Sequence, residues 1–303
     1  MKKRGTRPIE WTVLIGCILL ILAVAGVLVW LWTKAQNHIR EKGFGLFVWE
    51  EEVIEEEQWE ELASNIEQAD VTILYQNFSK RNLNEAKPAP FVKMLYEKGV
   101  DVYALVGKAE WAYETDGEHL IKWIRRVAAY NVKQGTDSRI RGIMVDVEPY
   151  LLEEWDAGEE ARTELMRGYL DGIKKGYVYA KDHGLTYLVC IPTFYDATND
   201  EILQELIAEG CDGVAVMNYN RQDEYGQICK EVDYAMASDK QVICIYELQP
   251  SGNHDLEDIN TYATVGLDAL WESAGQLEEQ FDYDKLRFAY HYYSPLREML
   301  EHY

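Results

Sequence analysis

Short apolar runs recur along the chain from about residue 45 onward, and amphipathic stretches of helical length separate them. Eight runs are rich in β-branched and aromatic residues and are predicted strands: 45–49, 71–75, 101–106, 142–147, 186–192, 213–219, 241–246 and 287–292. The intervening amphipathic stretches, which predict helices, include 58–68, 118–134, 159–183, 200–209 and 268–280. Because the predicted strands are continuously apolar rather than alternating, we expect a parallel sheet that is covered on both faces.

Eight strands that alternate with helices over about 250 residues predict an α/β fold, a (β/α)8 barrel at 43–303. No linker rich in Pro, Gly or Ser divides this part of the chain, so we expect one domain. A doubly wound sheet is the alternative, but it would carry a Gly-rich phosphate turn after its first strand. Here Trp49 is followed by three glutamates, which would repel a pyrophosphate. We interpret the acidic run 50–61 as the solvated start of the first helix.

The N-terminal segment has a different pattern, because residues 11–32 contain no charged side chain. Such a run is long enough to span a hydrocarbon core of roughly 30 Å. Four basic residues precede it and predict a cytoplasmic N-terminus: Lys2, Lys3, Arg4 and Arg7. A cleaved signal peptide or a lipobox at Cys17 are the alternatives, but the run is longer than a signal core and continues past Cys17. The expected organisation is a cytoplasmic tail at 1–10, a transmembrane anchor at 11–33, a linker at 34–42 and an extracytoplasmic barrel.

Composition excludes several classes of protein. The formal net charge is −23, from 53 acidic and 30 basic side chains, so nucleic-acid binding is not expected. The five cysteines show no CxxC spacing and the chain has no HExxH motif, so we expect neither a zinc site nor another cofactor. The four cysteines after Cys17 lie on or near predicted strands, which favours buried free thiols over disulfides.

Polar and aromatic residues gather at the C-terminal ends of the predicted strands, where barrels of this kind place their active sites. Carboxylates surrounded by Trp, Tyr and Asn are typical of a sugar-binding site, because aromatic rings stack on pyranose faces and amides bind hydroxyls. The candidate substrate-binding residues are Trp49, Tyr75, Trp111, Tyr150, Tyr195, Met217, Asn220, Glu247 and Tyr292.

Asp146 and Glu148 at the end of the fourth strand are the candidate catalytic pair. Residues two apart on a strand point to the same side, so one of the two pKa values should be raised. A carboxyl group of raised pKa is suited to protonate a glycosidic oxygen near neutral pH. The alternative is a structural ion pair with Arg141 or with arginines of neighbouring strands. For His291, at the end of the eighth strand, a place in the pocket wall is the alternative, and we interpret it as a buried, hydrogen-bonded histidine.

Two motifs resemble the chitinase-like glycoside hydrolases of family eighteen. Residues 141–148 resemble the strand-4 signature DGxDxDxE, with Gly142, Asp146 and Glu148 at matching positions. Arg141 and Met144 stand where that family has aspartates. Residues 217–220, Met-Asn-Tyr-Asn, resemble the strand-6 motif Met-x-Tyr-Asp or Met-x-Tyr-Asn.

The resemblance implies a reaction without an enzyme nucleophile, in which the 2-acetamido oxygen of the sugar attacks its own anomeric carbon. Glu148 would be the general acid and then the base, and Asp146 would orient the acetamido group. Tyr219 would hydrogen-bond that group and Asn220 would assist. The implied substrates are N-acetylated glycans, either peptidoglycan-like or chitin-like. Met144 removes the inner aspartate that helps the proton to move between acidic groups in the family.

Two other functions remain open at this point. In a two-glutamate retaining glycosidase, Glu148 would be the acid and base and Glu247 the nucleophile. Alternatively, the barrel is a catalytically inactive glycan-binding module, a reading that the departures at Arg141 and Met144 favour.

Overall fold

The computed structural model describes residues 17–22, 24 and 42–301. The chain divides into a unit of residues 1–41, in which residues 17–22 are helical, and a second unit of residues 42–303. The apolar run at 11–32 lies mostly outside the described residues. Among the residues that are described, no helix is long and apolar enough to cross a membrane.

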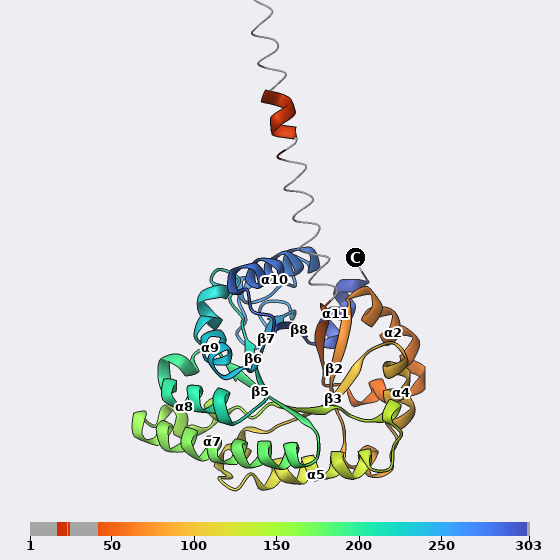
Figure 1. Ribbon diagram of the computed structural model, residues 1–303, viewed down its shortest axis with the longest axis vertical. Coiled ribbons are helices and arrows are strands. Elements are labelled where there is room, and N and C mark those ends of the chain that lie inside the picture. Colours follow the sequence, from red (N-terminus) through yellow and green to blue (C-terminus); the bar gives the residue numbers. More distant parts are fainter. Residues whose placement is uncertain (1–16, 23, 25–41, 302–303) are drawn as a thin grey trace, which may run out of the picture. The chain divides into compact units, whose positions relative to one another are not determined.

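Eight parallel strands form a closed barrel in chain order, which confirms the predicted (β/α)8 fold (Figure 1). The strands are β1 (Phe44–Val48), β2 (Val71–Asn77), β3 (Asp101–Val106), β4 (Gly142–Val145), β5 (Thr186–Pro192), β6 (Gly213–Met217), β7 (Gln241–Glu247) and β8 (Leu286–His291). The barrel closes where Phe44 of β1 pairs with Phe288 of β8.

Helices surround the barrel and cover the outer face of the sheet (Figure 1). They are α2 (Trp59–Gln68), α3 (Lys80–Asn84), α4 (Ala89–Glu97), α5 (Glu118–Asn131), α6 (Glu153–Asp156), α7 (Glu159–Asp182), α8 (Tyr195–Glu209), α9 (Glu224–Ser238), α10 (Leu267–Phe281) and α11 (Tyr293–Leu300). Short 3-10 helices lie in the loops: η1 (Glu51–Ile54), η2 (Glu56–Gln58), η3 (Ala109–Tyr113), η4 (Thr136–Ser138), η5 (Pro149–Leu151) and η6 (Asp258–Asn260). Helix α8 begins five residues earlier than the predicted 200–209 and has a non-helical residue, Asn199, inside it.

The acidic run at 50–61 is not the simple solvated start of a helix that the sequence suggested. It forms η1 and η2 before α2 begins at Trp59. Val53 and Ile54 within the run are buried, so the chain must turn inward between its glutamates. This local packing overrides the uniform polarity of the run and brings Glu50 and Glu52 to the mouth of the barrel.

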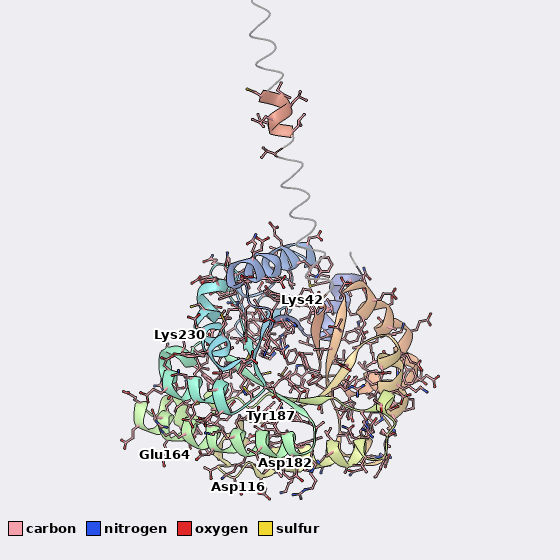
Figure 2. The ribbon with its side chains drawn as sticks, viewed as in Figure 1. Lys42, Asp116, Glu164, Asp182, Tyr187 and Lys230 are labelled. Carbon is pink, nitrogen blue, oxygen red and sulfur yellow. The ribbon has the colours of Figure 1, made fainter. Side chains whose placement is uncertain are left out.

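Apolar side chains fill the barrel interior and the layer between strands and helices. The interior cluster comprises Phe47, Tyr75, Leu105, Met144, Leu188, Cys190, Ala215, Ile243, Ile245 and Ala289. In the outer layer, Tyr187 of β5 is fully buried, and a Cβ on Gly176 of α7 would lie 2.5 Å from its hydroxyl. In Figure 2, Tyr187 lies inside the molecule, whereas Glu164 of α7 lies on its outer surface. The layer is therefore packed closely enough to fix the positions of the strand ends.

The fourth strand is two residues shorter than predicted, since β4 ends at Val145 instead of residue 147. Asp146 and Glu148 therefore follow the strand and belong to the loop above it. The N–H of Asp146 still donates to the carbonyl of Val106 at 2.8 Å, so β3 anchors the start of this loop.

Candidate active site

A cavity of about 980 Å³ opens at the C-terminal end of the barrel. This volume is at the upper end of the roughly 300–1,000 Å³ that is common for small-molecule sites. Eight of the twelve candidate residues line it: Trp49, Asp146, Glu148, Tyr150, Met217, Tyr219, Glu247 and Tyr292. They come from the ends of five strands, β1, β4, β6, β7 and β8, and from the loops that follow them.

Asp146 lies deep in the cavity above the apolar barrel interior. Burial, and then the neighbouring charge of Glu148, raises the pKa of the Asp146 carboxyl to about 7, against an opposing effect of His291. The thiol of Cys190 also hydrogen-bonds to Asp146, and burial keeps the pKa of this thiol well above its ordinary value. The Asp146 carboxyl can therefore hold a proton near neutral pH.

The alternative of a structural ion pair with Arg141 does not hold. Arg141 instead pairs with Asp101, with Nε 3.0 Å from Oδ1, and its guanidinium lies over the ring of Tyr96. Arg141 precedes β4 and Asp146 follows it, so the two side chains lie at opposite ends of the strand.

Glu148 is hydrogen-bonded to Tyr150, whose hydroxyl donates to Oε1 of the carboxylate. Burial, followed by the charge of Glu148, raises the pKa of Tyr150 far above its ordinary value, so the hydroxyl remains a donor. The same hydroxyl lies 4.0 Å from the sulfur of Met217. Edge-to-face contact with Phe194, at a ring separation of 5.3 Å, fixes the other side of the Tyr150 ring. The Glu148 carboxylate is thus held in one orientation toward the cavity that it lines.

Glu247 and His291 form a second pair in the cavity. Nδ1 of His291 lies 2.9 Å from Oε2 of Glu247, and the backbone N–H groups of Leu248 and Gln249 donate to Oε1. Glu247 is 2% exposed, whereas the side chain of His291 is 21% exposed and lines the cavity. The hydrogen bond confirms one part of the interpretation of His291, but the side chain is only half-buried and takes the alternative place in the cavity wall. Nothing in the sequence pointed to Glu247 as its partner.

The strand-6 motif contributes one tyrosine to the cavity. Tyr219 lines the cavity and its ring stacks on that of His291, with centroids 6.0 Å apart. Burial, and then the charge of Glu247, keeps the pKa of Tyr219 well above its usual value, so its hydroxyl can donate a hydrogen bond. Asn220 does not line the cavity, and its side chain accepts from the N–H of Gln222 at 3.1 Å. Asn218 is buried and donates to the carbonyl of Glu224 at 2.9 Å.

Three predicted aromatic residues do not line the cavity. Tyr75 points into the barrel interior and packs on Phe47, with ring centroids 4.8 Å apart. Trp111 of η3 stacks on His119 at 5.5 Å and is not among the residues that line the cavity. Tyr195 is the first residue of α8 and packs against Trp155 at 5.7 Å. The structure therefore assigns these rings to packing.

The cavity wall also contains residues that are not among the sequence-predicted site residues. Glu50 and Glu52 follow β1, and the hydroxyl of Ser294 donates to Glu50. Leu151 is 63% exposed at the rim. The remaining ones are Phe47, Cys190, Ile245, Gln249, His254, Leu256 and His291. Two kinds of residue among these carried a sequence signal: the glutamates after the first strand, which predict the start of a helix, and His291 at the end of the eighth strand, for which the pocket wall is the alternative interpretation.

The wall of the cavity is acidic. It contains five carboxylates: Glu50, Glu52, Asp146, Glu148 and Glu247. Among the described residues that line it there is no lysine or arginine, so His254 and His291 are its basic groups. In the described part of the chain no three or more His, Cys, Asp and Glu side chains are grouped so that they could hold a metal ion. All five cysteines are free, and Cys190, Cys211 and Cys244 are buried.

The barrel is similar in structure to several proteins of low sequence identity. A GH18 chitinase from Pseudoalteromonas aurantia has a TM-score of 0.53 and 10% identity, over 86% of this chain and 99% of the chitinase chain. Modules of the Clostridium thermocellum endo-1,4-beta-D-xylanase 10B reach 0.52 and 11%, over 82% of this chain and 59% of that one. A Toxoplasma gondii protein described as a deoxyribose-phosphate aldolase reaches 0.50 and 10%, over 90% and 95% of the two chains.

No protein-family model matches the chain, and no match is found among the curated proteins. At such identities the structural similarity shows the fold, and this fold hosts many chemistries. What the site does must therefore be argued from its own residues.

Proposed function

We propose that this chain is a glycoside hydrolase that cleaves glycans next to a 2-acetamido sugar. The observation that carries the proposal is the Asp146–Glu148 pair in the wall of the cavity, with a pKa of about 7 on Asp146. A carboxyl group with this pKa can supply a proton near neutral pH, which is what a general acid needs. The structural similarity to a GH18 chitinase is compatible with this function.

In the proposed reaction, Glu148 donates its proton to the glycosidic oxygen as the bond from that oxygen to the anomeric carbon breaks. The acetamido oxygen of the same sugar forms a new bond to the anomeric carbon, which gives a cyclic oxazolinium ion. Asp146 and the hydroxyl of Tyr219 hold the acetamido group. Glu148 then takes a proton from water, which attacks the anomeric carbon and opens the ring with overall retention of configuration.

The arrangement of Glu247 argues against the two-glutamate mechanism. A nucleophilic carboxylate needs an oxygen that can approach the anomeric carbon. Oε1 of Glu247 already accepts two backbone N–H groups, and Oε2 is paired with His291. Attack would break these interactions at a residue that is 2% exposed. The inactive-module alternative, for its part, gives no reason for two crowded carboxyl groups in one cavity.

The purified protein should be incubated with short oligosaccharides of N-acetylglucosamine, and with cello- and xylo-oligosaccharides of the same length. We expect cleavage of the acetylated chains alone, and NMR should detect the β-anomer of the product first. Cleavage of sugars that lack the acetamido group would favour a two-glutamate enzyme. If the oligosaccharides bind but are not cleaved, the alternative of an inactive glycan-binding module would be favoured.

We further propose that residues 11–33 anchor the protein in a membrane, with the barrel outside the cytoplasm. This rests on the charge-free run 11–32 and the basic residues that precede it. The acidic character of the whole chain, with a net charge of −23, suits a domain held away from anionic lipid headgroups.

A further inference from the structure

Glu247 is held in place by both of its carboxylate oxygens. Oε1 accepts hydrogen bonds from the N–H groups of Leu248 and Gln249, at 2.9 and 2.8 Å. Oε2 faces Nδ1 of His291 at 2.9 Å, and the two residues are direct neighbours on β7 and β8. A carboxylate that is fixed in this way is suited to orient its neighbour.

The ring of His291 is held on its other sides as well. Tyr219 stacks on it at 6.0 Å, and the ring of Phe47 meets it edge-on at 5.9 Å. Because a carboxylate accepts from Nδ1, the proton of the neutral imidazole belongs on Nδ1. The side chain lines the same cavity as Asp146 and Glu148.

His291 acts on Asp146 through its charge. The titratable groups that interact with Asp146 come from four strand ends: Glu148 and Tyr150 after β4, Cys190 and Tyr195 on and after β5, Tyr219 after β6, and His291 on β8. Burial and Glu148 raise the pKa of Asp146 to about 7, whereas His291 and then the Cys190 hydrogen bond lower it. His291 is therefore the basic group that limits how tightly Asp146 holds its proton.

Among the described residues, the barrel interior beneath Asp146 and Glu148 contains no basic group that could replace His291. Met144 is fully buried in the apolar cluster, at the position where the family-eighteen signature has an aspartate. A thioether is a weak acceptor and cannot exchange a proton with Asp146. The Cys190 thiol of the same cluster hydrogen-bonds to Asp146, but burial keeps the pKa of this thiol well above its ordinary value, so it stays neutral. The group that can act on the shared proton through a positive charge is His291 in the cavity wall.

We propose that His291, held in place by Glu247, is a positioning residue for the Asp146–Glu148 pair, and that its imidazole makes the proton shared by the two carboxyl groups easier to transfer. The proton then passes from the Asp146 carboxyl to the Glu148 carboxylate, where it is available to the glycosidic oxygen. This inference rests on the proposed function for its role in catalysis, but the coupling between His291 and Asp146 can be measured without turnover.

The test uses the full chain with ¹³C-labelled aspartate carboxyl groups. Asp146→Asn identifies the Asp146 signal, and the titration midpoint of that signal is measured by NMR in wild type and in His291→Gln. We expect the midpoint to rise by about one pH unit, because a nearby cation favours the ionised carboxylate. His119→Gln is the matched control, since His119 also pairs through Nδ1 with a glutamate, Glu114, but lies outside the cavity.

Turnover gives the second reading. If the active pair holds one proton, activity is present below its midpoint and is lost as pH rises through it. We therefore measure kcat on an acetylated oligosaccharide as a function of pH. In His291→Gln, the fall of kcat at high pH should move to higher pH by the same amount as the NMR midpoint. If the role of His291 were purely structural, the variant would have a lower kcat at every pH, and the pH at which kcat falls would not change.

Glu247→Gln offers a second route if His291→Gln does not fold, because it presents an amide N–H where Oε2 now accepts. It should move the Asp146 midpoint in the same direction, and the double variant should move it no further than His291→Gln alone. An unmoved Asp146 midpoint in these variants would overturn the proposal. If wild type cleaves no acetylated glycan but the midpoint still moves, the proposed function fails while the coupling stands.

Discussion

Gly107 and the backbone of Asp146 are in direct contact. A Cβ on residue 107 would lie 1.7 Å from the carbonyl oxygen of Asp146. Residue 107 follows β3, and the preceding carbonyl, that of Val106, accepts from the N–H of Asp146 at 2.8 Å. A side chain at position 107 would therefore push the loop that carries Asp146 and Glu148 away from β3.

We predict that Gly107→Ala lowers both stability and activity. Backbone that must shift to admit a methyl group typically costs about 1–3 kcal/mol, and Asp146 would move with it. Gly135→Ala is the control, because its Cβ would meet only the Asp137 side chain, with Oδ1 at 2.9 Å, and should change stability by no more than about 0.5 kcal/mol. Thermal unfolding and glycan turnover measure the two effects. If Gly107→Ala has wild-type stability and turnover, the loop after β4 can shift without affecting either property, and the prediction is wrong.

The barrel could be predicted from the sequence because its signal is repeated. Each buried strand is a continuous apolar run, and helix-length stretches separate the runs, so errors of two residues at β4 or five at α8 leave the topology unchanged. The place of Asp146 and Glu148 in the cavity wall could be predicted for a similar reason, since both residues lie within three positions of a strand end, where this fold places its active sites.

The wall of the cavity was harder to predict. Tyr75 and Tyr219 are the same residue type near strand ends, yet Tyr75 fills the barrel interior and Tyr219 lines the cavity. A shift of one residue along a strand moves a side chain to the opposite face of the sheet, and the residue type alone does not show which face it occupies. The partner of His291 is 44 residues away in the chain, so only the closed barrel reveals that the two side chains meet.

Glu148→Gln is expected to remove most of the activity. The amide keeps the shape of the side chain and its contact with Tyr150 but cannot donate the acid proton, so kcat should fall about 10²–10⁴-fold. Binding of an acetylated oligosaccharide, measured by calorimetry, should change little. Glu164→Gln on the outer face of α7 should keep wild-type turnover.

Glu247→Gln separates the two enzyme mechanisms. If the acetamido group is the nucleophile, we expect a loss of less than about tenfold in kcat at the pH optimum, since Glu247 then acts only through His291. If Glu247 were the nucleophile, turnover would collapse about as far as in Glu148→Gln. The same kcat measurement on one acetylated substrate decides between them.

Glu231 makes the fold sensitive to alkaline pH. It is 1% exposed on α9, and neither carboxylate oxygen is hydrogen-bonded to another residue. Burial is the main cause that raises its pKa to about 8, with a smaller contribution from Asp196. Because this folded-state pKa lies above the ordinary value of 4.5, stability is lost as pH rises between the two, and the loss is complete above about pH 8.

Glu231→Gln should therefore stabilise the protein more at about pH 9 than at about pH 5. Differential scanning calorimetry should show a difference in Tm that grows by several degrees over this range, since 1 kcal/mol corresponds to about 2–4 °C in a large domain. Glu205→Gln, on the neighbouring α8, is a control, because Glu205 is 41% exposed and pairs with Lys174. A difference in Tm that is constant with pH would mean that Glu231 is not protonated in the fold.

The proposed membrane anchor can be tested by protease accessibility. If residues 11–33 span the membrane with the N-terminus in the cytoplasm, protease added outside intact cells should degrade the barrel and spare a short N-terminal fragment. Variants that replace Lys2, Lys3, Arg4 and Arg7 together with neutral residues should weaken this orientation. Complete protection of the wild-type barrel would contradict the orientation, and a mature chain that begins after residue 25 would contradict the anchor.

The acidic wall of the cavity predicts a preference among glycans. Five carboxylates line it, with no lysine or arginine among the described lining residues, so a glycan that carries its own carboxylates is repelled. Uncharged, chitin-like chains should therefore bind at least about tenfold more tightly than carboxylate-bearing, peptidoglycan-like chains of equal length at low salt. Added salt should reduce the difference in affinity, since the screening length falls to about 10 Å at 0.1 M.

Glu52→Gln removes one charge from the wall without altering Asp146 or Glu148, and should reduce the preference while leaving binding of the uncharged chain intact. Calorimetry on both glycans measures the preference, and equal affinities at low salt would show that the wall does not select by charge.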